Sequence, residues 1–267
     1  MLFRSSAGAG DKLVGVVSYS DYPAAASRHA VVGSHLAWSL ESIVALDPDL
    51  VIMWASGSGL NRLAVLEELG FTVYVSEPRA LDDVVKTIRD IGELAGTVSE
   101  SELEAARLER ELLRLRERYA DEPEVSVFYQ MWDQPLQTLN GSHLITRVIE
   151  LCGGRNIFGD AADLAPKINI ESVLQRDPEV IVASGMDAAR PEWLDGWRLY
   201  PSLQAVQSQA LYFVHPDLLQ RPTARIIEGA TELCRHLDTH RQSQAALRGQ
   251  APQAEQGQTQ ARPEEAP

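Results

Sequence analysis

The spacing of apolar residues predicts one long helix in the middle of the chain, over residues 99–120. This stretch is rich in leucine, alanine, glutamate and arginine and contains neither glycine nor proline, a composition that favours helix. Ser99 and Glu102 fit a capping box at its start. Two heptads are too few for a coiled coil, so we expect the apolar stripe to pack on the rest of the protein. The stripe steps by three and four residues: Ala105, Leu108, Leu112, Leu115 and Tyr119.

Two segments on either side of this helix repeat each other. Residues 40–54 read LESIVALDPDLVIMW and residues 170–184 read IESVLQRDPEVIVAS, with Glu, Ser, Asp and Pro at the same places. Each copy predicts a short helix, a tight Asp-Pro turn and a buried parallel strand, because proline cannot continue a helix and β-branched runs suit strands covered on both faces. The repeat predicts two similar lobes, with the long helix as a rigid strut between them.

The remaining segments alternate strand and helix, which predicts an α/β fold with parallel sheets. A chain of 267 residues is long enough for two domains. We expect a first lobe over residues 1–97, a linker helix over 98–121 and a second lobe over 122–240. Residues 241–267 carry almost no large apolar side chain, which predicts a disordered tail.

The net charge of −14 argues against a nucleic-acid partner, since neutralising phosphates needs a basic surface. No apolar run reaches transmembrane length. The first residues lack the sustained apolar stretch of a signal peptide.

The chain has two cysteines, Cys152 and Cys234, and no C-x-x-C motif. This removes the common zinc and redox motifs. The two residues are either inert core thiols or one disulfide in an oxidising compartment, and composition does not choose between them.

No motif assembles an active site. Residues 57–62 (GSGLNR) resemble a dinucleotide-binding turn, but Arg62 replaces its third glycine, so a plain strand-to-helix turn is the better interpretation. His236 and His240 lie four residues apart without an evident third metal ligand, and we interpret them as solvated surface histidines. Because no hydrolase motif occurs either, we expect neither an enzyme nor a bound metal or cofactor.

Aromatic residues gather at the predicted carboxyl ends of strands: Tyr19, Tyr22, Trp54 and Trp132. In open α/β sheets, ligands bind at that edge. Each aromatic alone is more simply a core residue, but four of them favour a cleft for a large, partly apolar ligand.

Glu41 and Glu171 hold equivalent places in the repeat, near a helix start where the dipole stabilises a carboxylate. Their simpler interpretation is capping charge. The alternative is that the repeat places one carboxylate on each lobe, where a two-fold symmetric partner can bind both.

Several motifs resemble the helical-linker substrate-binding proteins of bacterial ABC importers, in particular the vitamin B12-binding family. They are VGVVSYSDYP at residues 14–23, the first Glu repeat, CGGRNIF at residues 152–158 and RII at residues 225–227. The resemblance spans residues 10–237. It implies two Rossmann-like lobes joined by the helix, with cobalamin held in the cleft between them.

The resemblance also implies roles for individual residues. Tyr19 falls on a corrin contact, Trp54 on an aromatic wall of the cleft, and residues 217–221 on a contact loop of the second lobe. Glu41 and Glu171 fall on the two carboxylates that dock to a dimeric permease. Cys152 and Cys234 fall on a family disulfide, which implies the periplasm. The predicted ligand contacts are therefore Tyr19, Trp54, Trp132, Asp217, Leu218, Leu219, Gln220 and Arg221.

The chain departs from the family pattern in three places. Leu218 and Leu219 replace aromatic residues of the contact loop, and His35 replaces a cleft tryptophan, although Trp38 is near. The loop at residues 131–140 also differs. The family's first strand has no counterpart, so the chain resembles an N-terminally truncated member.

We therefore expect a monomeric, non-enzymatic cobalamin-binding protein that delivers its ligand to an ABC permease without inserting into the membrane itself. The same fold carrying haem or a ferric siderophore is the nearest alternative. A corrinoid needs groups that bind amides, whereas haem usually needs a Tyr or His iron ligand in the cleft. More distant alternatives are a dinucleotide-dependent enzyme using residues 57–62 and a docking module that works through Glu41 and Glu171 without a ligand.

Overall fold

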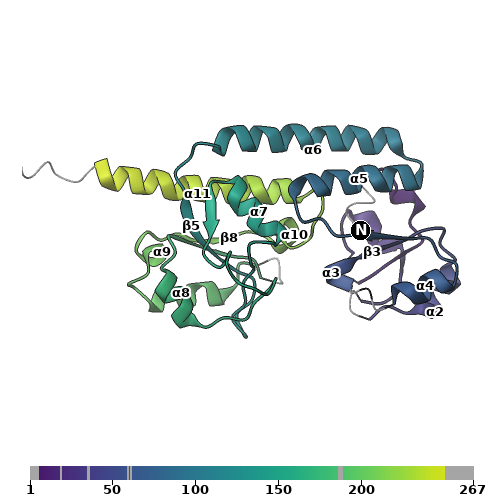
Figure 1. Ribbon diagram of the computed structural model, residues 1–267, viewed down its shortest axis with the longest axis horizontal. Coiled ribbons are helices and arrows are strands. Elements are labelled where there is room, and N and C mark those ends of the chain that lie inside the picture. The colour runs from purple at the N-terminus through teal and green to yellow at the C-terminus, as the bar shows by residue number, and fades with distance from the viewer. Residues whose placement is uncertain are drawn as a thin grey trace, which may run out of the picture.

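The protein has two α/β lobes side by side beneath one long helix (Figure 1). The computed structural model describes residues 6–18, 20–34, 37–58, 60, 62–185 and 189–249. Parallel strands form the sheets of both lobes, as expected. Tyr19, His35 and the end of the chain from residue 250 lie outside the described residues.

The long helix α6 runs from Val98 to Tyr119, and Figure 1 shows it above both lobes. Its predicted stripe is correct, since Ala105, Leu108 and Leu112 are at most 1% exposed. The predicted capping box is wrong: the helix begins one residue earlier, and its N-cap Thr97 makes no side-chain cap bond.

Helix α5 (Leu81–Ala95) lies against α6. A Cβ on Gly92 of α5 would come within 2.0 Å of the Ser101 hydroxyl oxygen of α6. Glycine at this position therefore allows the two helices to approach closely at their shared end.

The first lobe contains two separate pairs of parallel strands. Strand β1 (Gly15–Val16) pairs with β2 (Ala30–Val31), and β3 (Val51–Trp54) pairs with β4 (Val73–Ser76). Strand β1 is shorter than predicted, and β2 was not predicted. The helices of this lobe are η1 (Gly10–Lys12), η2 (Ala24–Arg28), α2 (Leu40–Leu46), α3 (Ala55–Ser58) and α4 (Leu63–Glu68).

A hollow of about 680 Å³ separates the two strand pairs, with residues 14–17 on one wall and residues 51–54 on the other. We call it the sheet slot. In the described part of this lobe, no strand joins β1 to β3. Most of its lining belongs to the first lobe, so we interpret the slot as a gap between the two strand pairs. Arg221, Pro222 and Thr223 of the second lobe also line it, so the slot reaches the space between the lobes.

The second lobe has one four-stranded parallel sheet in the order β6-β5-β7-β8. Its central strand β5 is buried along its whole length. The strands are β5 (Val125–Gln130), β6 (Gly154–Asn156), which was not predicted, β7 (Val180–Ala183) and β8 (Leu211–Phe213). The helices are α7 (Leu144–Leu151), α8 (Ile170–Arg176), η3 (Glu192–Leu199), α9 (Gln204–Gln207), α10 (Pro216–Leu219) and α11 (Ile226–Gly249).

The repeated segments fold alike. The N-caps Ser39 of α2 and Asn169 of α8 accept the backbone N–H three residues ahead. Asp47 and Asp177 end the two helices in the left-handed conformation, at φ 40° and 41°. Each aspartate precedes the proline that stops the helix, so the repeat encodes the same helix–turn–strand unit in both lobes.

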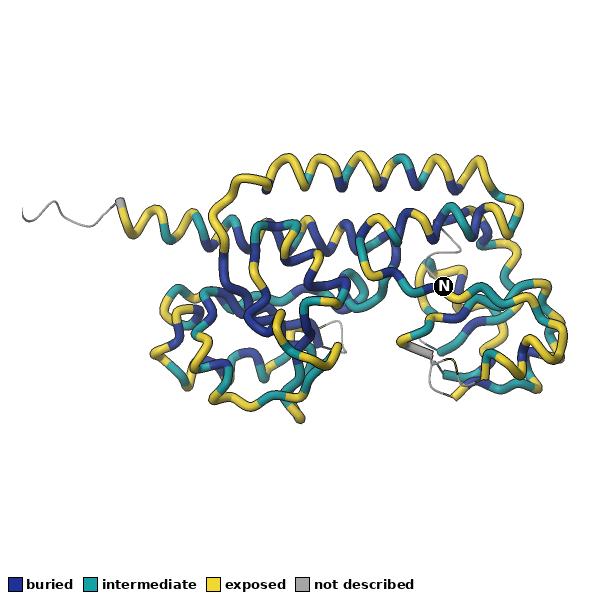
Figure 2. The backbone as a smooth tube through the Cα atoms, viewed as in Figure 1, coloured by how far each residue is buried: buried dark blue, intermediate teal, exposed yellow. Residues whose placement is uncertain are grey.

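One hydrophobic cluster runs from the first lobe into the second. It joins α5 and α6 to β5, α7 and α11 through residues such as Ile88, Leu108, Val127 and Leu233. In Figure 2 the buried positions continue along α5, α11 and the strands of the second lobe. Since α6 contacts α5, α7 and α11, it packs on both lobes.

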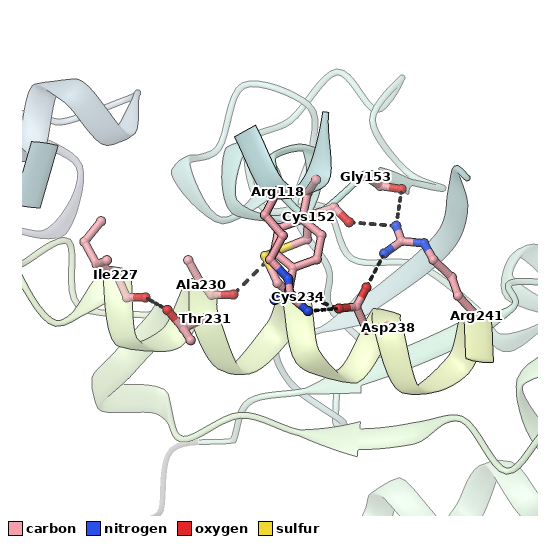
Figure 3. Close-up of a disulfide and its surroundings, with 10 residues drawn as sticks. Arg118, Cys152, Gly153, Ile227, Ala230, Thr231, Cys234, Asp238 and Arg241 are labelled. Carbon is pink, nitrogen blue, oxygen red and sulfur yellow. Dashed lines mark hydrogen bonds and ion pairs between the residues drawn. A yellow bond between two sulfur atoms is a disulfide. The ribbon is translucent and has the colours of Figure 1, made fainter. Parts of the chain in front are cut away.

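Cys152 and Cys234 form a disulfide with their Cα atoms 4.7 Å apart. Figure 3 shows that it joins the end of α7 to α11, next to Asp238 and Arg241. The bond closes a loop between residues 82 positions apart, for which the chain-entropy model gives about 4 to 5 kcal/mol. The family pairing is therefore present.

Two predictions near the C-terminus are wrong. Helix α11 continues to Gly249, so residues 241–249 of the predicted disordered tail are helical. Arg241 anchors this part, donating to the carbonyls of Pro123, Cys152 and Gly153. His240 is only 3% exposed, and His236 stacks on the Tyr212 ring, so neither is a solvated surface residue.

Candidate functional site

A cleft pocket of about 420 Å³ lies between the two lobes. The first lobe contributes the residues that follow β3 and β4. The second lobe contributes the start of α7 and the end of α10, so the cleft follows the carboxyl ends of strands, as the fold predicts. It is lined by Trp54, Ala55, Ser56, Glu77, Pro78, Arg79, Asn140, Ser142, His143, Leu144, Ala162, Leu164, Leu219, Gln220 and Pro222.

Trp54 and Glu77 form the first-lobe wall. Trp54 is the last residue of β3, and Glu77 directly follows the neighbouring parallel strand β4, so both lie at the same edge of the sheet. Trp54 is 37% exposed. The Glu77 carboxylate accepts the backbone N–H of Ser56 through Oε2 at 2.7 Å, which satisfies one donor of the first turn of α3. This wall therefore places an aromatic ring beside a carboxylate that a backbone hydrogen bond fixes in position.

His143 is the half-buried polar side chain of the second-lobe wall. It is the N-cap of α7, and its Nδ1 accepts the N–H of Ile145 at 3.1 Å. A neutral imidazole whose Nδ1 accepts a hydrogen bond carries its proton on Nε2. Burial lowers the pKa of His143 to about 4, against the opposing effect of the negative charge of Glu77. At neutral pH, His143 is therefore an uncharged donor.

An ion-pair cluster links the lobes beside the cleft. Arg221 of the second lobe pairs with Asp21 of the first at 2.8 Å and with Asp217 at 2.9 Å. The hydrogen bond from Arg221 holds the pKa of Asp21 below its usual value. Arg225 lies over the ring of Tyr22, 4.4 Å from its centroid. These contacts bridge the lobes, and Arg221 lies between Gln220 and Pro222, which line the cleft pocket.

The structure places the predicted ligand residues in different surroundings. Trp54, Leu219 and Gln220 line the cleft pocket, although the Gln220 amide donates to the carbonyls of Ser184 and Gly185. Trp132 donates its indole N–H to the Gln134 carbonyl at 3.0 Å, and Leu218 packs against the main core. Asp217 and Arg221 belong to the ion-pair cluster, and Tyr19 lies outside the described residues. Contact of any of them with a ligand remains a prediction.

Sequence reasoning missed Glu77 and His143. Glu77 directly follows strand β4, and the end of a parallel strand is the place where polar ligand contacts are expected. His143 directly precedes the apolar run of α7, the N-cap place, but histidine is not among the usual N-cap residues. Both signals are visible in the sequence once strand and helix ends are examined for polar residues.

The two repeat glutamates, Glu41 and Glu171, are exposed. They lie in the first turns of α2 and α8. In Figure 1 both helices are on the side of the lobes that faces away from α6. The structure therefore places one carboxylate on each lobe, on the same side of the molecule.

The described residues hold no cluster of three or more His, Cys, Asp or Glu side chains arranged for a metal ion. Within that same part of the chain, no helix is long and apolar enough to cross a membrane.

The family model for periplasmic binding proteins matches residues 2–218. The chain therefore belongs to the periplasmic binding protein family, a class of solute-binding proteins and not of enzymes. This confirms the expectation of a binding protein in place of the dinucleotide-dependent enzyme.

Particular relatives narrow the comparison. The vitamin B12-binding protein of Vibrio cholerae is 35% identical over 232 residues, which cover 87% of this chain and 83% of the relative. The crystal structure of the periplasmic vitamin B12 binding protein BtuF of Vibrio cholerae matches with a TM-score of 0.83 and 34% identity, covering 90% of this chain and 93% of that one. The haem-binding protein RhuT from Roseiflexus matches with a TM-score of 0.78 but 21% identity, covering 90% and 94%, which shows the shared fold alone.

Proposed function

We propose that this protein captures cobalamin, or a related corrinoid, in the cleft between its lobes and delivers it to an ABC-type permease. The observation that carries the proposal is the similarity to vitamin B12-binding proteins along both lobes, 35% identical over 87% of the chain. The chemistry of the cleft supports it. Trp54 offers a flat apolar face to a macrocycle, and Glu77 and His143 offer hydrogen bonds to its polar arms.

Haem is the second candidate, since haem-binding relatives share the fold. A haem site needs an axial ligand to iron, most often His or Tyr. His143 is the one histidine among the residues that line the described cleft. Its Nδ1 is occupied by the Ile145 N–H, so Nε2 carries the proton and has no free lone pair for iron. No tyrosine is among the described residues that line the cleft pocket, so the cleft favours the corrinoid.

Titration with cyanocobalamin tests the proposal. We expect saturable one-to-one quenching of tryptophan fluorescence, with calorimetric heat that gives the same affinity. Haem and a ferric siderophore serve as competitors, and NAD serves as a negative control. Saturable binding of haem without binding of cyanocobalamin would contradict the proposal.

We further propose that Glu41 and Glu171 dock the protein to the permease dimer. Both carboxylates are exposed, and they occupy equivalent places of the structural repeat. A permease with two equivalent subunits presents two equivalent basic sites, so a pair of carboxylates on one side of the molecule fits it.

Charge reversal tests the docking. We expect Glu41→Arg combined with Glu171→Arg to abolish binding to the reconstituted permease, while cyanocobalamin affinity stays unchanged. Glu93→Arg combined with Glu117→Arg is the matched control, because these glutamates are also exposed and lie on α5 and α6. Docking that survives the first pair of reversals would refute the role of the two repeat glutamates.

The periplasm is the compartment that we propose, because the family is periplasmic and the Cys152–Cys234 disulfide suits an oxidising compartment. We propose that the protein acts there as a monomer, without inserting into the membrane. Size-exclusion chromatography with light scattering, with and without ligand, tests the oligomeric state.

A further inference from the structure

His143 and Glu77 line the same pocket from opposite lobes, and the protein holds one polar atom of each. The Nδ1 of His143 accepts the Ile145 N–H at 3.1 Å, and the Oε2 of Glu77 accepts the Ser56 N–H at 2.7 Å. These bonds fix both side chains. They leave the Nε2–H of His143 as a donor and the Oε1 of Glu77 as an acceptor.

The two free atoms differ in what they recognise. An uncharged N–H donor suits a carbonyl oxygen, and a carboxylate oxygen suits an N–H donor. A carboxamide carries both groups, so it can satisfy either side chain. A carboxylate only accepts hydrogen bonds, and in this cleft it would meet the like charge of Glu77, which disfavours it.

We propose that His143 and Glu77 select a ligand that carries carboxamide arms over one that carries carboxylate arms. His143 donates to an amide carbonyl, and Glu77 accepts from an amide NH₂. The inference rests on the proposed function, since it names the chemical feature by which the same cleft recognises its ligand. In this proposal His143 donates a hydrogen bond to the bound molecule and does not coordinate the metal ion of that molecule.

Arg79 is the charged group that acts in the opposite direction. It lines the same pocket and is exposed at its rim, where a guanidinium attracts carboxylates. Glu77 is the more constrained of the two, because a backbone N–H holds it. The selection therefore requires that Glu77 repel a ligand carboxylate more strongly than Arg79 attracts it, and the Arg79→Gln variant tests this balance.

The histidine series separates capping from ligand recognition. His143→Ser keeps an N-cap acceptor for α7 but loses the donor toward the cleft, whereas His143→Asn keeps both. We expect His143→Ser to weaken cyanocobalamin binding about fivefold, the effect of one hydrogen bond, and His143→Asn to change it less than about twofold. His215→Ser is the matched control, since the Nδ1 of His215 caps α10 through the Asp217 N–H at the same 3.1 Å, outside the cleft lining.

The glutamate series tests the selection itself. The probe is cyanocobalamin with one carboxamide arm hydrolysed to a carboxylic acid, compared with the intact compound by calorimetry at pH 7.5. We expect the unaltered protein to bind at least one of the positional acids about tenfold more weakly than cyanocobalamin. Glu77→Gln should reduce this difference in affinity, because the glutamine keeps an acceptor for the Ser56 N–H but has no charge to repel the acid. Arg79→Gln should increase the difference, because it removes the positive charge that attracts the acid.

The outcomes are distinct. No cyanocobalamin binding by the unaltered protein would overturn the proposed function and this inference with it. Binding that is unchanged in His143→Ser, or equal affinity for the amide and every acid, would overturn the inference alone. A haem complex whose absorption spectrum shows histidine ligation, lost in His143→Asn, would also overturn it.

Discussion

At the scale of single residues, the roles of two histidines were not predicted from the sequence. His143 caps a helix and His240 lies in the core at 3% exposure. Sequence patterns favour Ser, Thr, Asp and Asn as caps and treat isolated histidines as surface residues. Neither rule assigns a role to a neutral histidine whose ring nitrogen replaces a hydroxyl or carboxylate oxygen. The place of His143 directly before α7 is visible in the sequence, but its role as the cap and the burial of His240 were found in the structure.

Buried neutral histidines make stability depend on pH. Burial lowers the pKa of His143 to about 4, below the value of about 6.5 in an unfolded chain. Between these values the unfolded state binds more protons, so stability is complete above pH 6.5 and decreases as the pH falls toward 4. We expect His143 alone to remove about 2 kcal/mol from the free energy of unfolding between pH 7 and pH 5.

Urea denaturation at the two pH values, followed by tryptophan fluorescence, measures this loss. His143→Asn keeps the cap without the titration, so its stability should fall by about 2 kcal/mol less over the same interval. An equal fall in both proteins would contradict the assignment of the effect to His143.

At the scale of elements, local patterns predicted helices and turns well and sheet partners poorly. The stripe of α6 and the helix–turn–strand repeat follow from periodicity and from the Asp-Pro turns, which are local. Strands β2 and β6, of two and three residues, were missed. Such short strands are defined by the strand they pair with, which is a non-local property that periodicity does not contain.

The buried stripe of α6 predicts a large difference between two leucines of one helix. Leu108 is fully buried, whereas Leu103 is 74% exposed. We expect Leu108→Ala to reduce the free energy of unfolding by about 2 to 5 kcal/mol, because it leaves a cavity in the shared core. Leu103→Ala, the control, should change it by less than about 0.5 kcal/mol. Chemical denaturation compares them, and similar losses would show that α6 does not pack as described.

At the scale of the whole molecule, the two lobes share a repeat but differ in completeness. Strand β7 is buried throughout between β5 and β8, while its counterpart β3 is mostly half-buried and borders the sheet slot. The repeat could be found from sequence because both copies encode the same local unit. The repeat therefore predicted two similar lobes, but how each strand is covered depends on its neighbours in the sheet, and the structure shows that the two sheets differ.

This inequality predicts different hydrogen exchange at two equivalent positions. Ser184 donates its N–H to the Gln130 carbonyl of β5 at 3.2 Å. In strand β3, the N–H of Val51 donates to the Thr72 carbonyl on the β4 side. The N–H groups of successive residues in a strand point to opposite sides. The N–H of Trp54, the counterpart of Ser184, therefore points away from β4 and toward the sheet slot. We expect the Trp54 amide to exchange at least about tenfold faster than that of Ser184. Amide exchange by NMR measures both, and equal protection would mean that the slot is filled in solution.

The path of α6 across both lobes has a thermodynamic consequence. The heat capacity of a protein changes on ligand binding in proportion to the apolar surface removed from water. A binding protein whose lobes close like a hinge removes its own inter-lobe surface as well as that of the ligand. Here one core cluster fixes α5, α6 and α11 together, so we expect the lobes to bury no further apolar surface against each other on loading. The heat capacity change on loading, measured by calorimetry at several temperatures, should then equal that of enclosing the ligand alone.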